Sequence, residues 1–322
     1  YASRGLGDVY KRQVIGSGAL IDLCKFVSFN NNQNLIVFCS SLTAAATTST
    51  VSLTNNGVKE SVKSKVPLSI IIDLDNLKLA PHRLLRSALG DVLCRSTCQV
   101  DWLTSHLLLN TEYDETPFAL QYEDEKILLE NSSKLLIGDY EALAALSRMT
   151  LLNGIAAIIV GSTHAGSMGE HLISHYIDMF MGDKHPGTLH GEQVGVTTLL
   201  ISKIQNQIIN YSDNLEFKKL KVTEEDFEKL FGNKIHTKMF KQFQSKFFDN
   251  EKLNNVNNLL KTKWPDQRAI LKKYLLPTDK IEKALKNCGA PTSNGELRIP
   301  NNFFNRAIQD SFLLRDRFSY LD

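Results

Sequence analysis

The 322-residue sequence has little that would mark a secreted, membrane-bound or nucleic-acid-binding protein. Its five cysteines are scattered without a CxxC pair, which argues against a disulfide framework and fits a reducing cytoplasm. The net charge is only +2, so neither nucleic acid nor a membrane surface is indicated as a partner. We find no apolar run of transmembrane length and no secretory signal. The 43% hydrophobic and 22% charged fractions are ordinary for a globular protein.

The most informative stretch, Gly166 to Leu200, contains three histidines. His171 and His175 lie one helical turn apart, and His190 follows in a Leu-His-Gly-Glu run. Apolar residues occupy most other positions around the two imidazoles, so we expect a largely buried helix that shows both rings on one side. Each histidine alone could be a hydrogen-bonded core residue. Three of them in a Gly-rich, apolar setting favour a metal or catalytic site.

Local signals set the expected ends of that helix. Ser167 and Glu170 have the spacing of a capping box, which predicts a helix start. Gly182 and Pro186 mark the expected end.

A catalytic metal site needs three protein ligands and an open position, so a further ligand must come from elsewhere. We expect 81–109 to form one long amphipathic helix. Asp91 is the polar exception on a stripe that otherwise contains Leu84, Ala88, Cys98 and Trp102. A buried lone carboxylate is costly unless it is paired or metal-bound, which makes Asp91 the candidate ligand, although a helix cap or a solvent-facing Asp is the alternative. Cys94 and Cys98 could suggest a metal pair, but we interpret them as small apolar packing residues.

A strand, a glycine turn and a helix are predicted across Val14 to Lys25. Gly16 and Gly18 would let the backbone approach a pyrophosphate, which the amides at a helix start favour. The pattern is not the full GxGxxG fingerprint, because Ile21 occupies the third glycine position.

Two further strands are predicted at Leu35–Cys39 and Val66–Asp73. The small, hydroxyl-rich segment Ser40–Thr54 between them is either a flexible linker or a loop that closes over a cofactor. In the second case Thr43 and Ser52 would donate hydrogen bonds, because ligands bind at the carboxyl ends of strands in open α/β sheets.

These patterns divide the chain into three parts. Residues 1–13 have no hydrophobic period, and we expect them to be a non-native leader. Residues 14–80 are expected to form a partial dinucleotide-binding α/β domain. Residues 81–322 are expected to form an all-helical metal and catalytic domain.

Taken together, the motifs resemble sn-glycerol-1-phosphate dehydrogenase, a branch of the group shared by glycerol dehydrogenase, iron-containing alcohol dehydrogenases and dehydroquinate synthase. The resemblance extends over nearly everything after residue 13. Its motifs are GSGALID at 16–22, KVPLSIIIDLD at 65–75, ALGDVL at 88–93, DW at 101–102, GEHLISHYIDM at 169–179, LHGEQVG at 189–195, LKNCGAP at 285–291 and LRDRFSYLD at 314–322.

The resemblance implies a dehydroquinate synthase-like fold, with an incomplete α/β nucleotide domain and an all-α metal-binding domain. It implies Zn²⁺, or another divalent metal such as Fe²⁺ or Ni²⁺, held by Asp91, His171 and His190, with His175 contacting a small phosphorylated substrate. It implies NAD or NADP and allows a homo-oligomer. The residues implied for the cofactor are Gly16, Gly18, Ala19, Leu20, Ile21, Asp22, Thr43 and Ser52.

Three departures from the family pattern stand out. Leu42 replaces the proline of a Pro-Thr pair, and Thr48 replaces a substrate-contacting Asp, which could weaken substrate orientation. The family also has strands before the glycine turn, and we expect the corresponding N-terminal part to be missing from this chain, so the resemblance implies NAD or NADP without a preference.

The leading hypothesis is reversible reduction of dihydroxyacetone phosphate to sn-glycerol 1-phosphate, a glycerophospholipid precursor. His175 would relay the proton, and Glu192 either orients a ligand imidazole or lies at the surface. One alternative is a carbocycle-forming lyase like dehydroquinate synthase. The other is a non-catalytic or fragmentary relative, which Thr48 and the missing strands motivate.

Overall fold

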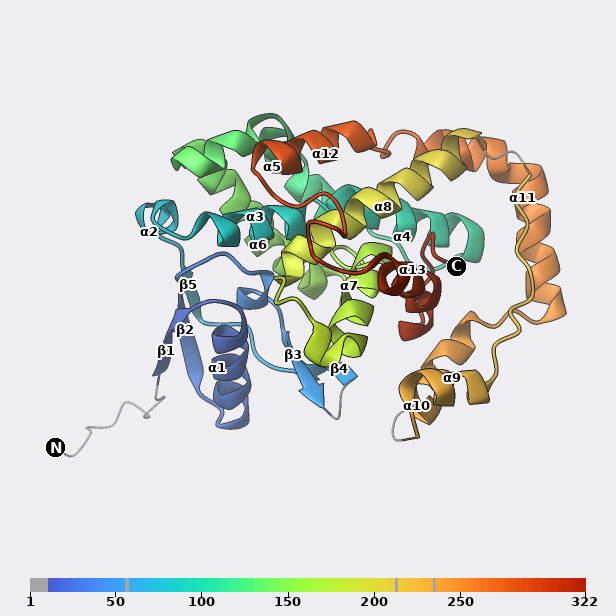
Figure 1. The fold of residues 1–322 in the computed structure, drawn as a ribbon, viewed down its shortest axis with the longest axis horizontal. Coiled ribbons are helices and arrows are strands. Elements are labelled where there is room, and N and C mark those ends of the chain that lie inside the picture. The colour runs from blue at the N-terminus through green and yellow to red at the C-terminus, as the bar shows by residue number, and fades with distance from the viewer. Residues whose placement is uncertain (1–10, 56–57, 212–213, 234–235) are drawn as a thin grey trace.

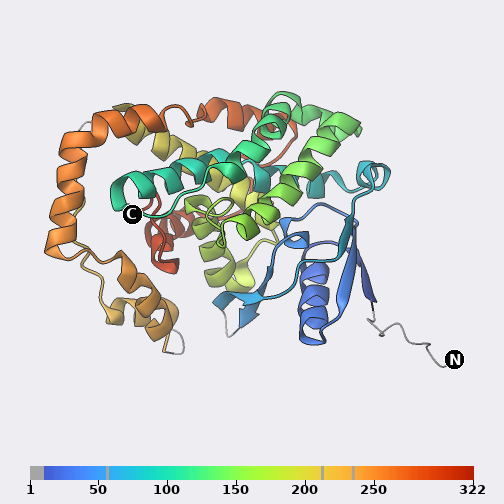
Figure 2. The ribbon, with the colours of Figure 1, turned by 180° about the vertical axis from the view of Figure 1, so that it is seen from behind.

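The structure is a computed structural model that describes residues 11–55, 58–211, 214–233 and 236–322. Strands gather at one end of the molecule, and helices make up the rest (Figures 1 and 2). Among the described residues, no strand lies beyond Ile71. The chain therefore has the predicted combination of an α/β part and a helical part.

The α/β part is built on a parallel sheet with the strand order β1-β2-β5. These strands span Lys11–Gly16, Asn34–Cys39 and Ser69–Ile71. Helix α1, Gly18–Asn30, connects β1 to β2, and a small core forms between helix and sheet, composed of Val14, Ile21, Leu35, Val37, Cys39 and Ala46. The strand predicted at 35–39 is confirmed, whereas the one predicted at 66–73 is only three residues long. Strand β1 also includes the last three residues of the expected leader.

The segment 40–54, expected to be a flexible linker or a loop, contains regular secondary structure. It contains the short helix η1, Ala44–Ala46, and strand β3, Thr50–Asn55. Strand β3 pairs antiparallel with β4, Val58–Lys63. The hydroxyl of Thr47 donates to the carbonyl oxygen of Leu151 over 2.9 Å, which ties the segment to helix α6. A free linker is therefore excluded.

The helical part follows from Leu74 onward. Its α-helices are α2 Leu74–Lys78, α3 His82–Val92, α4 Arg95–Leu109, α5 Thr116–Asn131, α6 Tyr140–Ile159, α7 Gly169–Phe180, α8 His190–Tyr211, α9 Glu224–Phe231, α10 His236–Phe243, α11 Asn250–Leu271, α12 Thr278–Asn287 and α13 Asn301–Asp310. Short 3-10 helices follow several of them, namely η2 Ser132–Ile137, η3 Gly182–Lys184, η4 Gln244–Lys246 and η5 Ser311–Leu314. The single helix expected over 81–109 is wrong, because the chain turns at Leu93 and Cys94 and forms α3 and α4.

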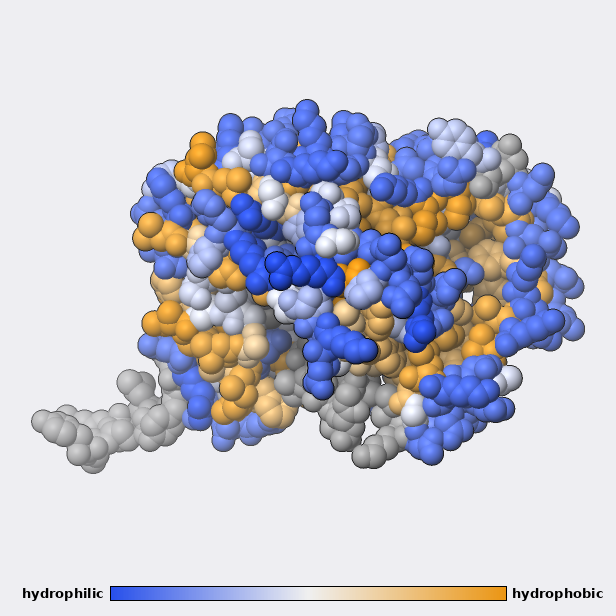
Figure 3. Space-filling view, in the orientation of Figure 1, coloured by the Kyte–Doolittle hydropathy of each residue, from blue (hydrophilic) through white to orange (hydrophobic). Residues whose placement is uncertain are grey.

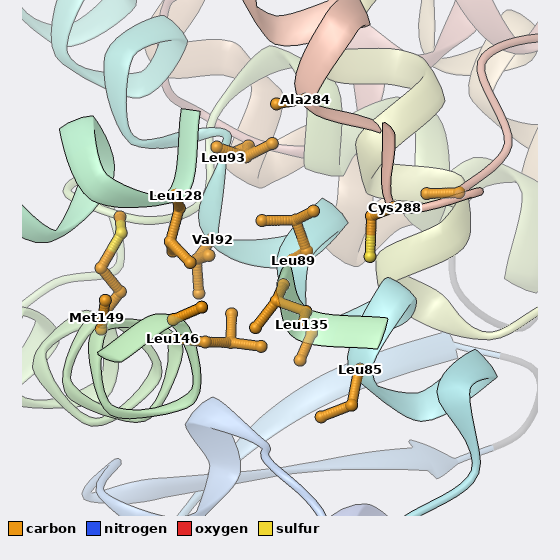
Figure 4. Close-up of a cluster of buried hydrophobic side chains, with 14 of the residues drawn as sticks. Leu85, Leu89, Val92, Leu93, Leu128, Leu135, Leu146, Met149, Ala284 and Cys288 are labelled. Carbon is orange, nitrogen blue, oxygen red and sulfur yellow. The ribbon is translucent and has the colours of Figure 1, made fainter. Parts of the chain in front are cut away.

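The main core lies where α3, α5, α6, α8 and α12 meet (Figure 4). Leu89 and Val92 of α3 face Leu128 of α5 and Leu146 of α6 in this core, and all four side chains are at most 2% exposed. A second core, rich in phenylalanine, joins α7 to α9, α10 and α13. Helix α8 contributes side chains to both cores, and α7 packs in the second one, which fixes the residues that the two helices carry.

Helix α6 corrects the expectation that the chain has no apolar segment of membrane-spanning length. By length and composition alone it could cross a bilayer. A core helix passes the same test, and Leu143, Leu146 and Met149 of α6 are fully buried in the main core. Arg148 on the same helix forms an ion pair with Asp124 of α5. Packing inside the protein therefore accounts for about half of this apolar stretch, of which 50% is buried, whereas Ile155, Ile158 and Ile159 near its end are exposed.

Helices α9, α10 and α11 form an arm that leaves the end of α8 and returns to the body (Figure 1). A cavity of about 910 Å³ lies between this arm, α4, α8 and the C-terminal segment. Its apolar lining includes Leu108, Phe217, Leu260 and Trp264, and an apolar hollow is visible beside α11 in Figure 3. The cavity is separate from the three residues predicted to bind a metal, since none of them lines it.

Candidate metal centre

The helix carrying two of the three histidines is α7, and its start differs from the expectation. It begins at Gly169 with Met168 as the N-cap residue, and no side chain caps it. The capping box from Ser167 to Glu170 is therefore wrong. The Glu170 carboxylate instead accepts from the Met168 backbone N–H at 2.7 Å and lies inside the protein. The expected end is close to the observed one at Phe180.

Three side chains from three helices converge at one point. Oδ1 of Asp91, in α3, lies 3.5 Å from Nε2 of His171, in α7, and 3.8 Å from Nε2 of His190, at the start of α8. One oxygen and two nitrogen atoms from these residues all lie within 4.8 Å of one another. The structure thus brings together the three side chains predicted to be ligands.

Close packing of α3 against α8 produces this convergence. A methyl group on Gly90 would overlap the carbonyl oxygen of Gly191, and a methyl group on Gly191 would overlap that of Ser87. Only glycine allows the two backbones to touch here. Asp91 and His190 are the chain neighbours of the two glycines, so the helix contact sets their separation.

His175 lies beside the three converging side chains without being one of them. Its ring stacks on that of His190 with the centroids 5.8 Å apart. The ring of His171 is 6.1 Å away in an edge-on arrangement. His175 is therefore a neighbour of the three side chains and not a member of the group that could hold a metal ion.

The imidazoles of His171 and His190 both make a hydrogen bond through Nδ1, the nitrogen that does not face Asp91. The Nδ1 atom of His171 lies 2.9 Å from Oε1 of Glu170, and that of His190 lies 3.0 Å from the Ser174 hydroxyl. Ser174 in turn donates to Gln193 at 2.7 Å. Partners of this kind orient a metal-binding ring and fix its tautomer. Sequence reasoning missed Glu170 in this role, because its spacing from Ser167 suggested a helix cap.

Burial and charge pull the pKa values of this region in opposite directions. Burial lowers the pKa of His171, but its bonds to Asp91 and to its other acceptors raise it well above the ordinary value. Burial raises the pKa of Glu170, while its bond with His171 and its other donors bring it below the ordinary value. The buried environment therefore favours a positively charged group between Asp91 and the imidazoles, as a proton or a cation.

Glu192 fits neither of the two roles considered for it. It is 8% exposed, and its carboxylate accepts from Arg83 Nε and Nη2, both at 2.7 Å. It also accepts from the Leu189 backbone N–H at 2.7 Å, just before α8 begins. Glu192 therefore holds the start of the helix that carries His190, and it reaches that imidazole only through the backbone.

The predicted cofactor residues occupy the first turn of α1 and the segment that follows β2. Gly16 ends β1, and Gly18 begins α1 with a φ of +40°, a backbone conformation that favours glycine. Ala19 and Leu20 are exposed on the first turn. Ile21 is buried against the sheet and Asp22 is half-buried, so neither is as open to a ligand as Ala19 and Leu20.

Two more predicted cofactor residues lie in the segment after β2. Thr43 is half-buried directly before η1. Ser52 belongs to β3, but its side chain lies outside the described residues. Helix η1 and strand β3 both pack against α1. This arrangement keeps Thr43 on the α/β side of the molecule.

Thr48, the position at which the resemblance implies a substrate-contacting Asp, bonds to a buried lysine. The Thr48 hydroxyl lies 2.8 Å from Nζ of Lys25, which is 1% exposed and also donates to the carbonyl oxygen of Thr50. Burial lowers the pKa of Lys25 to about 8, although the charge of Asp22 opposes this shift.

Comparisons with known proteins point to one family. Residues 11–81 match the family model of iron-containing alcohol dehydrogenases. The chain is 30% identical over 210 residues to a glycerol-1-phosphate dehydrogenase from Pyrococcus horikoshii described as using NAD(P)⁺, over 65% of this chain and 58% of that protein. A protein of the same description from Halalkalibacterium halodurans is 24% identical over 310 residues, which cover 95% of this chain and 69% of that one.

The fold also matches solved structures. A 1,3-propanediol oxidoreductase has a TM-score of 0.58 at 16% identity, over 97% of this chain and 73% of that one. The chain spans little more than half the length of the first curated relatives it matches. The resemblance drawn from the motifs, and the fold it implied, are confirmed by these matches.

Proposed function

We propose that this chain belongs to the glycerol-1-phosphate dehydrogenases, within the wider group of iron-containing alcohol dehydrogenases, and interconverts dihydroxyacetone phosphate and sn-glycerol 1-phosphate. The observation that supports this most directly is the convergence of Asp91, His171 and His190 from three helices. The names of the curated relatives supply the substrate and the cofactor class, NAD or NADP.

The donor set at this point suits a catalytic divalent cation. One carboxylate oxygen and two imidazole nitrogens leave a coordination position for substrate, as catalytic zinc sites do. Asp91, His171 and His190 would hold the cation, which we take to be Zn²⁺, with Fe²⁺ and Ni²⁺ as the other candidates. Glu170 and Ser174 hold the two rings so that both Nε2 atoms face Asp91.

When bound, the cation would act as a Lewis acid on the carbonyl oxygen of the substrate, and the nicotinamide would supply or accept the hydride. The chain itself orients the substrate and moves the proton. His175 would give a proton to the substrate oxygen in reduction and take it back in oxidation, and its stacking on His190 supports this role. The backbone amides at the start of α1, beside Gly16 and Gly18, would receive the pyrophosphate of the cofactor.

The test follows NADH and NADPH absorbance with the metal-loaded 322-residue chain and dihydroxyacetone phosphate. In the reverse direction, sn-glycerol 1-phosphate and its enantiomer sn-glycerol 3-phosphate are compared. We expect cofactor oxidation with dihydroxyacetone phosphate, and reverse turnover with sn-glycerol 1-phosphate only. His190→Ala should lose the activity, and His82→Ala, at an exposed position of α3, should keep it. No turnover by the cation-loaded chain would favour a non-catalytic relative.

A further inference from the structure

Three side chains with metal-binding atoms gather beside His171, and Glu170 among them contacts its Nδ1 atom, the ring nitrogen that does not face Asp91. Cys94 precedes α4 and Cys98 lies in its first turn, while Glu170 and His171 begin α7. Their exposed fractions are 1%, 0%, 0% and 6%, respectively. Both thiols also pack in the small apolar cluster around Trp102, as the sequence predicted. The proposed reaction makes no direct use of either thiol.

The cluster is centred on one oxygen of Glu170. Oε1 of Glu170 lies 3.1 Å from Sγ of Cys98 and 2.9 Å from Nδ1 of His171. The sulfur of Cys94, a carboxylate oxygen of Glu170 and a nitrogen of His171 all lie within 4.8 Å of one another. Ligands around a tetrahedral zinc ion are roughly 3.5 Å apart, so small side-chain shifts would bring these atoms to a common cation.

We propose that Cys94, Cys98, Glu170 and His171 form a second cation site, specific for a thiophilic divalent ion such as Cd²⁺. Two thiolates, one carboxylate oxygen and one imidazole nitrogen make a closed four-ligand set, unlike the three-ligand set of the proposed catalytic site. Thiolate ligands select soft cations over hard ones. The site differs from the catalytic one in both its geometry and its preferred ion.

The proton and charge balance of binding is simple. The two thiol protons leave to solvent, the His171 proton moves from Nδ1 to Nε2, and no electrons are transferred. Two thiolates and one carboxylate around a divalent cation leave a net charge of −1. The Arg317 guanidinium is close enough to interact with Cys98 and Glu170. It is held there by bonds to Thr163 and to the carbonyl oxygen of Ser167.

The two sites share one imidazole, so they exclude each other. Nε2 of His171 faces Asp91 and its Nδ1 faces Glu170. A neutral imidazole binds a metal through its unprotonated nitrogen only. A soft cation on Nδ1 therefore places the proton on Nε2 and removes His171 from the catalytic set. This exclusion rests on the proposed function, whereas the existence of the thiolate site does not.

The experiment titrates the chelator-stripped chain with Cd²⁺ and records the ultraviolet thiolate-to-cadmium absorption. We expect one cadmium ion per chain with this band. Cys94→Ala and Cys98→Ala should each weaken the band and lower the cadmium affinity at least tenfold, and the double variant should lose the band. Cys288→Ala, at a buried thiol outside the cluster, should keep the full band and affinity. An undiminished band in both single variants, a band in the double variant, or no band in the unaltered chain would overturn the proposal.

A second measurement needs no variant. X-ray absorption of the cadmium-loaded chain should report two sulfur ligands, and a shell of only oxygen and nitrogen would contradict the site. Competition is tested by adding Co²⁺ to the cadmium-loaded chain. The site of Asp91, His171 and His190 should then bind cobalt far more weakly than it does in the cadmium-free chain. Simultaneous tight binding of both ions would overturn the exclusion. Activity is measured separately, on cadmium-free chain loaded with Zn²⁺. A chain that shows the cadmium band but no dehydrogenase activity with Zn²⁺ would contradict the proposed function and leave the thiolate site standing.

Discussion

Gly90 of α3 and Gly191 of α8 meet backbone to backbone, so that a methyl group on Gly90 would overlap the carbonyl oxygen of Gly191. Because Asp91 and His190 adjoin these glycines, Gly90→Ala should push the two ligands apart. We expect a loss of about 1–3 kcal/mol in the free energy of unfolding from overpacking. We also expect cation affinity to fall. Thermal unfolding and cation titration of the variant measure the two effects.

The matched control is Gly295→Ala. A methyl group at Gly295 meets no atom closer than the Ser293 hydroxyl oxygen, 3.9 Å away. This variant should unfold like the unaltered chain and bind the cation equally well. Equal behaviour of the two alanine variants would show that the α3–α8 contact does not set the ligand geometry.

Replacing Glu170 by Gln tests whether this carboxylate orients His171. Glutamine keeps the size of the side chain but weakens its acceptor for the ring N–H, which lies 2.9 Å from Oε1. Loss of such a partner typically lowers metal affinity 10- to 100-fold. Cobalt titration of Glu170→Gln should show a drop in this range. Glu225→Gln, which alters an exposed carboxylate of α9 paired with Lys229, should leave the affinity unchanged.

His175→Gln separates proton transfer from cation binding. The ring of His175 stacks on His190 but does not belong to the converging set. Loss of a general acid–base group typically lowers turnover 10²- to 10⁴-fold. We therefore expect kcat to fall in this range while the cation content of the purified variant stays unchanged. A variant with normal kcat, or one that also loses its cation, would refute the role assigned to His175.

The titration of Lys25 should make the free energy of unfolding depend on pH in the alkaline range. Burial lowers its folded-state pKa from 10.5 to about 8, with Asp22 opposing the shift. Between about pH 8 and pH 10.5 the unfolded chain keeps a proton that the folded chain has released, so this contribution to stability increases as pH rises. Over this range the free energy of unfolding should increase by on the order of 2 kcal/mol.

Urea unfolding at pH 7.5 and pH 10 measures this contribution. Lys25→Met should lack the increase, and Thr48→Asp should reduce it, because a carboxylate beside Nζ keeps the lysine charged. Identical pH dependence in all three proteins would show that Lys25 titrates normally.

The sequence indicated the three converging side chains because each lies in a motif of the resembling family, and the apolar strand at 35–39 was visible from its composition. The motifs did not indicate which side chains orient the imidazole rings of His171 and His190. Glu170 satisfied a local capping pattern, yet its carboxylate turns inward to His171. Local spacing does not distinguish a helix cap from a buried tertiary contact.

The hairpin of β3 and β4 was missed for a similar reason. Small hydroxyl residues suit loops and strands alike, and the pairing that decides between them comes from 58–63, where no strand was expected. The continuous helix expected over 81–109 failed because its apolar stripe continues through the turn at Leu93 and Cys94. In both cases tertiary packing overrode the local pattern.

The most direct test of this account is the binding of Co²⁺ to the chelator-stripped chain and to three single variants, Asp91→Asn, His171→Ala and His190→Ala. Visible absorption distinguishes a nitrogen and oxygen site from a thiolate one. We predict one cobalt ion per chain without a thiolate band, and at least a hundredfold loss of affinity in each variant. Three variants that bind cobalt as tightly as the unaltered chain would contradict the assignment of Asp91, His171 and His190 as the metal ligands.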